Sequence, residues 1–126
     1  MYSPAYNEAM EFAAAVIQAV KASGYVMDYP LEQLISESAR IGEKLLTAEV
    51  SQEMVPSHTF QSNMEESYKD GIRCSHLSLY WMDILEASGS YSQIPFALIR
   101  EKCESLQGLL RSGMKTFELL LGKRRF

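Results

Sequence analysis

Long hydrophobic runs are missing from this chain of 126 residues. No apolar stretch approaches the ~20 residues that a membrane-spanning helix needs. The first ten residues also lack the basic and apolar regions of a secretory signal peptide. The sequence therefore predicts a cytoplasmic protein that is not held in a membrane.

Motifs for metal and phosphate chemistry are equally scarce. No Glu-x-x-His pair occurs, although di-iron four-helix bundles use that spacing to point two ligands into the core. A Gly-rich phosphate loop and zinc-ligand spacing are absent as well, and the glutamates fall mostly on the solvent faces of the predicted helices. The sequence predicts no metal, no cofactor and no enzymatic activity.

Cysteine is also rare, since the chain holds only Cys74 and Cys103. Both fall inside predicted helices, where buried thiols in a reducing compartment are the simpler interpretation and a disulfide between helices is the alternative. A chain of this size buries about two-thirds of the surface that its unfolded form exposes. Its core therefore requires neither a disulfide nor a metal.

The most regular feature present is a stripe of mostly apolar residues in the last thirty positions. Its members follow one another at steps of four and three, which keeps them on one face of an α-helix. Three earlier segments repeat the same rhythm, and the connections between the first two and the last two are short. We therefore predict an all-α, up-down-up-down antiparallel four-helix bundle, one domain over residues 1–126, with helices at about 3–23, 30–50, 59–87 and 94–121.

Helix boundaries follow from capping residues. Ser3 is an N-cap residue followed by Pro4 at the first helical position, and Gly24 provides a C-terminal stop. Pro30 and Pro95 can open the second and fourth helices in the same way. The predicted core stripes are Tyr6, Met10, Ala13, Ile17 and Val20; Leu31, Leu34, Ser38, Ile41, Leu45 and Ala48; Met64, Tyr68, Gly71, Ser75, Ser78, Met82 and Leu85; and Ile99, Cys103, Leu106, Leu110, Gly113, Phe117 and Leu120.

Small residues occupy the middle of the third stripe. Gly71, Ser75 and Ser78 predict a tight helix crossing in which a bulky partner fills the space. A glycine inside a helix costs roughly 1 kcal/mol relative to alanine, and close packing is a physical reason to tolerate that cost.

The third helix also carries apolar residues almost all the way round. A bundle helix buries about half of its circumference, so some of these side chains face another surface. We predict homo-oligomerisation through the third and fourth helices; a wide core with a few exposed apolar residues is the alternative. The candidate interface residues are Leu77, Tyr80, Trp81, Ile84, Leu98 and Leu109.

Charge is unevenly distributed around a net value of −4. Residues 28–53 hold six acidic and two basic residues, whereas residues 100–126 hold seven basic and three acidic ones. Opposite signs can stabilise neighbouring helices, or the basic helix and tail can bind nucleic acid or an acidic partner. The candidate contacts for such a partner are Arg111, Lys115, Lys123, Arg124 and Arg125.

His76 is the one candidate for a general base. Cys74 lies two residues away and so on a different face of the helix, which disfavours a Cys–His dyad. A small enzyme that uses His76 remains an alternative, and it requires a carboxylate or hydroxyl within hydrogen-bond reach.

The second predicted helix, PLEQLISESARIGEKLLTAE, carries a family resemblance. Together with the last helix, it resembles the four-helix-bundle proteins of 23S rRNA intervening sequences. The matching features are the opening at Leu31, Gln33 and Leu34, the small residues Ser38 and Ala39, and the phase of the LLRSGMK segment in the last helix. Relatives of that family include the accessory protein of diversity-generating retroelements. The departures are Ile35 and Ser36 in place of an arginine pair, Gly42 in place of a mid-helix proline, and Lys44-Leu45-Leu46-Thr47-Ala48 in place of the usual Asn-Ile-Ala-Glu-Gly ending.

The resemblance implies bundles that assemble as rings, often pentamers, without enzymatic activity and with RNA or reverse-transcriptase partners. Together with the residue patterns, it leads us to predict a non-enzymatic, oligomeric binding or scaffold protein with no small-molecule substrate. Nucleic-acid binding through the basic fourth helix and tail is the first alternative, and an enzyme that uses His76 is the second.

Overall fold

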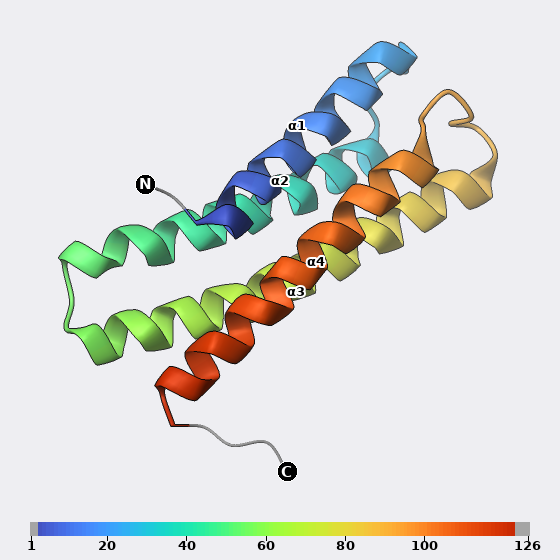
Figure 1. Cartoon of the computed structure of the whole chain (residues 1–126). Coiled ribbons are helices and arrows are strands. Elements are labelled where there is room, and N and C mark those ends of the chain that lie inside the picture. The colour runs from blue at the N-terminus through green and yellow to red at the C-terminus, as the bar shows by residue number, and fades with distance from the viewer. Residues whose placement is uncertain (1–2, 123–126) are drawn as a thin grey trace.

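The computed structural model describes residues 3–122, which form long helices joined by short connections (Figure 1). The helices are α1 (Pro4–Ser23), α2 (Tyr29–Val50), α3 (Ser57–Ser88) and α4 (Phe96–Leu120), with a 3-10 turn, η1 (Ser51–Glu53), after α2. No strand occurs in this described part of the chain. The all-α prediction is confirmed, and each predicted helix end lies within two residues of the observed one.

The predicted caps account for the start of α1. The Ser3 hydroxyl accepts a hydrogen bond from the Tyr6 amide at 3.0 Å, and Pro4 occupies the first turn. At the other end of the helix Gly24 adopts a left-handed conformation with φ of 75°, which glycine reaches without a Cβ clash. Pro95 differs from the prediction because it precedes α4, which begins at Phe96.

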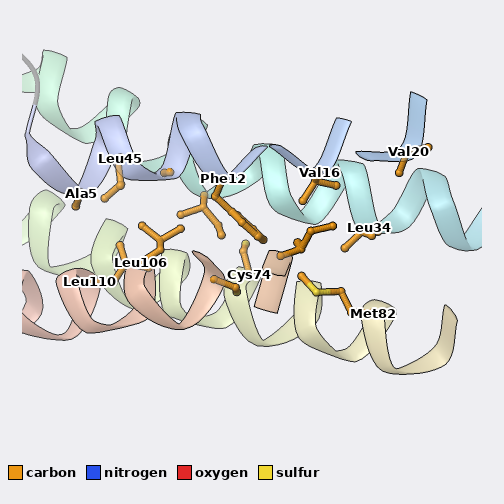
Figure 2. Packing of buried hydrophobic residues seen from close by; sticks show 14 of the residues in the cluster. Ala5, Phe12, Val16, Val20, Leu34, Leu45, Cys74, Met82, Leu106 and Leu110 are labelled. Carbon is orange, nitrogen blue, oxygen red and sulfur yellow. The ribbon is translucent and has the colours of Figure 1, made fainter. Parts of the chain in front are cut away.

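Each helix packs against two others. The backbone of α2 lies close to α1 and α3, and that of α4 close to α3 and α1, whereas no Cα atoms of the diagonal pairs α1–α3 and α2–α4 come within 8 Å in the described residues. The α1–α2 and α3–α4 connections lie at one end of the molecule and the α2–α3 connection at the other (Figure 1). All four helices contribute to one core, shown in close-up in Figure 2, whose largest fully buried side chains include Phe12, Leu31, Leu34, Ile41, Leu45, Met82, Leu85, Ile99, Leu106 and Leu110.

The predicted face of α1 is wrong. Met10 is 53% exposed and Ile17 is also exposed, while Phe12 and Val16 are buried. Tyr6 and Ala13 are only partly buried, so Val20 is the one member of the predicted stripe that lies in the core. The buried stripe of α1 is Ala5, Ala9, Phe12, Val16 and Val20, four of which are labelled in Figure 2.

The predicted stripes of α2 and α3 are confirmed, since every one of their members is buried. The small-residue crossing of α3 is confirmed too. A Cβ placed on Gly71 would lie 3.2 Å from a methyl carbon of Leu110 and 3.5 Å from one of Ile41. Leu110 and Ile41 are therefore the bulky partners that fill the space left by glycine.

The α4 stripe is buried only over its first half. Ile99, Cys103, Leu106 and Leu110 lie in the core, Gly113 and Phe117 are partly buried, and Leu120 is exposed. The C-terminal end of α4 lies apart from α1 in Figure 1. Its last turn therefore lacks the second helix that covers the stripe elsewhere.

Polar groups cross the middle of the core. The Gln107 side-chain amide donates to the Ser75 hydroxyl at 2.9 Å, and the Ser38 and Ser78 hydroxyls lie 3.4 Å apart. The expectation that glutamates lie on solvent faces fails at Glu37 and Glu65, which are buried. Glu37 pairs with Arg40 at 3.1 Å and Glu65 with Lys69 at 3.8 Å, which offsets part of the cost of burying a carboxylate.

Asp28 links two connections at one end of the molecule. Its carboxylate accepts the Leu31 amide of α2 at 3.1 Å and also the hydroxyl of Tyr91, from the α3–α4 connection. The Tyr91 ring packs edge-on against Tyr25 with 5.3 Å between centroids, and the Tyr25 hydroxyl accepts the Gln93 amide at 3.1 Å. Donation to Asp28 stabilises the neutral phenol and raises the pKa of Tyr91.

We expect Asp28→Ala to lower the free energy of unfolding by about 1–2 kcal/mol, because it removes both the N-cap of α2 and the acceptor for Tyr91. Urea denaturation followed by circular dichroism measures the change. Asp28→Asn is the matched control, since asparagine caps a helix about as well as aspartate. Equal losses for the two variants would contradict the capping role.

Candidate functional site

The predicted interface residues lie on two separate faces. Leu77, Tyr80, Trp81 and Ile84 all belong to α3, where steps of three and four place Leu77, Tyr80 and Ile84 on one stripe. Leu98 instead lines a groove between α1 and α4, beside the small α1 residues Ala15, Ala19 and Ala22. Leu109 of α4 is partly buried against the core. The structure therefore brings four of the six residues together.

The α3 residues form an aromatic and aliphatic surface with the first residue of α2. The Trp81 ring packs edge-on against Tyr29, with 5.8 Å between centroids, and against Tyr80 at 5.3 Å. Tyr29 is 64% exposed, Tyr80 53% and Leu77 40%, while Trp81 and Ile84 are half-buried. We call this surface the α3 patch; it consists of Tyr29, Leu77, Tyr80, Trp81 and Ile84.

Sequence reasoning missed Tyr29. It stands beside Pro30 at the start of a helix, and that position identifies a helix end rather than a surface. Only the packing of α2 along α3 brings it next to Trp81, more than fifty positions away in the chain. The local signal that could have marked it is an aromatic residue at a helix start, away from the Leu31 stripe.

A second surface is a groove between α3 and α4, with a volume of about 460 Å³. Arg111 and Lys115, predicted as contacts for a nucleic acid or an acidic partner, line it from α4. Lys69 and His76 line it from α3, and Ile72 and Met114 complete the lining. We call this surface the cationic groove. Sequence reasoning did not connect the two lysines, the arginine and the histidine, because they come from two helices.

The other predicted basic contacts, Lys123, Arg124 and Arg125, lie outside the described residues. Within α4, Arg100 donates to Asp83 and Glu86 of α3, each at 2.6 Å, and its guanidinium lies 6.0 Å from the centre of the Phe96 ring. Arg100 therefore pairs with acidic residues of a neighbouring helix, but these belong to α3 and not to the acidic segment 28–53. Arg111 and Lys115, in contrast, make no ion pair with any described residue.

The two cysteines are placed where their reactivity is low. Cys74 and Cys103 are free and buried, so the disulfide alternative is not formed. Burial raises the pKa of the Cys103 thiol to about 12, and burial together with the nearby Glu37 charge raises the pKa of Cys74. Since the thiolate is the reactive form, both thiols are poor nucleophiles at neutral pH.

His76 is exposed in the cationic groove. The other residues that line the groove are cationic or apolar, and His76 makes no hydrogen bond to the described part of the chain. The groove lining therefore supplies His76 with none of the carboxylate or hydroxyl partners that a general base uses.

Within residues 3–122, no cluster of three or more His, Cys, Asp or Glu side chains could hold a metal ion. No helix in that range is long and apolar enough to cross a membrane. No protein-family model, curated protein or solved structure matches the chain. Function is therefore inferred from the α3 patch and the cationic groove.

Proposed function

We propose that this chain is a non-enzymatic binding or scaffold subunit that self-associates through the α3 patch. The observation that carries the proposal is the exposure of Leu77 and Tyr80 next to the Tyr29–Trp81 pair. Clustered aromatic side chains are typical of the buried centre of protein interfaces. A second copy of the chain that covers this patch removes its apolar area from water, which favours association.

The subunit is proposed to be a single up-down-up-down antiparallel bundle that works in the cytoplasm. Two features support the topology. Among the described residues, close backbone approaches join consecutive helices and the first helix to the last, and the connections alternate between the two ends (Figure 1). Assembly as a pentamer, with an RNA or reverse-transcriptase partner, is what the resemblance to intervening-sequence proteins implies, and it stays a prediction.

Two alternatives carry less support. An enzyme that uses His76 needs a partner for the imidazole, and the groove around it offers lysine and arginine instead. Nucleic-acid binding would use Arg111 and Lys115 with the tail residues 123–125. Its test is whether a 20-nucleotide oligouridylate binds the protein more tightly than acidic helical peptides do.

We expect the protein at micromolar concentration to form particles of two or more chains. Light scattering coupled to size-exclusion chromatography should therefore give a mass at least twice the 14.3 kDa of one chain. The double variant Leu77→Glu, Tyr80→Glu should elute as a monomer, because two carboxylates at the centre of an apolar interface would lose their hydration without gaining partners. Its helix content should match that of the wild type, since both side chains are exposed in the subunit.

Leu119→Glu is the matched control, because Leu119 is an exposed leucine near the end of α4 and lies outside the α3 patch. It should leave the particle mass unchanged. A wild-type protein that is monomeric at micromolar concentration would contradict self-association. If Leu98→Glu dissociates the particle while the α3 double variant does not, the interface lies at the α1–α4 groove and the α3 patch is rejected.

A further inference from the structure

We infer that the cationic groove binds an acidic amphipathic helix of a partner protein, with apolar side chains of that helix seated on Ile72 and Met114. This inference rests on the proposed function as a binding subunit and names the class of its partner. It uses a different surface from the α3 patch, so the two proposals can fail separately.

The charge of the groove is the first argument. Lys69, Arg111 and Lys115 are cationic at neutral pH, His76 adds a further hydrogen-bond donor, and no carboxylate belongs to the lining. Arg111 and Lys115 are one helical turn apart on α4 and exposed, so they can meet acidic residues at the same spacing on a partner helix. The chain as a whole is acidic, with a net charge of −4, and the lining of this groove has the opposite sign.

The apolar part of the lining is the second argument. Ile72 and Met114 are both partly buried and packed against the core, so the groove lining combines apolar and cationic side chains. An amphipathic helix fits such a surface because its apolar side chains enter the groove while flanking carboxylates meet the cations. Methionine adapts its shape to different partners more readily than branched residues do.

A nucleic acid fits this lining less well. Sequence-tolerant binding of single strands depends on aromatic side chains on which the bases stack, and no Phe, Tyr or Trp lines the groove. Lys69 of the lining also pairs with Glu65 at 3.8 Å, which leaves fewer unpaired cations for a phosphate backbone.

The test is selection from a phage-displayed library of 16-residue helical peptides, followed by fluorescence anisotropy with the enriched peptides made synthetically. We expect the enriched peptides to be acidic, with apolar residues at positions i, i+3, i+4 and i+7. The variant Arg111→Glu, Lys115→Glu should weaken their binding by about tenfold or more, as charge reversal opposite an acidic partner does. A 20-nucleotide oligouridylate serves as the competing probe.

Lys102→Glu is the matched control, because Lys102 is an exposed cation of α4 that lines the α1–α4 groove instead. It should change peptide affinity by no more than about twofold, since distant surface charges are largely screened by salt. The inference is overturned if no peptide is enriched, if the enriched peptides are neutral or basic, if both α4 variants weaken binding equally, or if oligouridylate binds more tightly than the peptides. The Leu77→Glu, Tyr80→Glu variant should still bind peptide, which separates this outcome from failure of self-association.

Discussion

Replacing Phe12 by alanine is expected to lower the free energy of unfolding by about 3–5 kcal/mol. Phe12 is 1% exposed and is among the largest fully buried side chains of the protein. Figure 2 shows it pointing from α1 into the core, on the same side of the helix as Val16. Its removal would leave a cavity between packed helices that can close only partly, so both the transfer energy and the packing contacts are lost.

Met10→Ala is the control for this prediction, because Met10 is a large apolar residue of the same helix but points to solvent. It should change the free energy of unfolding by less than about 0.5 kcal/mol, the usual range for surface substitutions. Urea denaturation at one fixed protein concentration measures both, since association of subunits raises apparent stability. A larger loss for Met10→Ala than for Phe12→Ala would show that α1 presents the face predicted from its sequence rather than the face observed.

The rotation of α1 could not be predicted because its sequence offers two apolar faces. One holds the large residues Met10 and Ile17, and the other combines Phe12 and Val16 with alanines. The second face is buried because small residues let α1 approach α2 closely. A Cβ placed on Gly42 would lie 3.7 Å from the Cβ of Ala9. Backbone proximity of this kind depends on both helices, and a pattern within one helix does not contain it.

The face of α2 was predictable for the opposite reason. In α2 the large apolar residues Leu31, Leu34, Ile41 and Leu45 lie on one stripe with a polar face opposite, so only one rotation buries them. The helix ends were predictable because caps act locally, as the Ser3–Tyr6 hydrogen bond illustrates.

The α3 patch and the cationic groove were each predictable from the sequence only in part. The adjacency of Arg111 and Lys115 follows from a spacing of four on one helix. Their placement opposite Lys69 and His76, and that of Trp81 beside Tyr29, depends on how α3 packs against its neighbours. Patterns within a helix therefore give half of each surface, and the packing of helices supplies the other half.

Alanine at Gly113 and alanine at Gly108, both in α4, should change the free energy of unfolding in opposite directions. A Cβ on Gly113 would lie 2.4 Å from the Cζ atom of Tyr68, a separation that real atoms do not reach. The Tyr68 ring is buried, and it stacks on Phe117 with 5.8 Å between centroids. Phe117 in turn meets Phe60 edge-on at 6.4 Å, so the Tyr68 ring has little room to move. Gly113→Ala should therefore lower the free energy of unfolding by about 1–3 kcal/mol, the usual cost of overpacking.

Gly108→Ala is the matched substitution, because an added Cβ there meets no atom within 4 Å. Alanine is favoured over glycine inside a helix by roughly 1 kcal/mol, so this variant should be more stable than the wild type by up to that amount. Chemical denaturation of the two variants beside the wild type measures both signs in one experiment. If Gly113→Ala proves as stabilising as Gly108→Ala, the end of α4 does not pack closely on α3. Since Arg111 and Lys115 flank Gly113 on that helix, such a result would also remove the geometry on which the cationic groove depends.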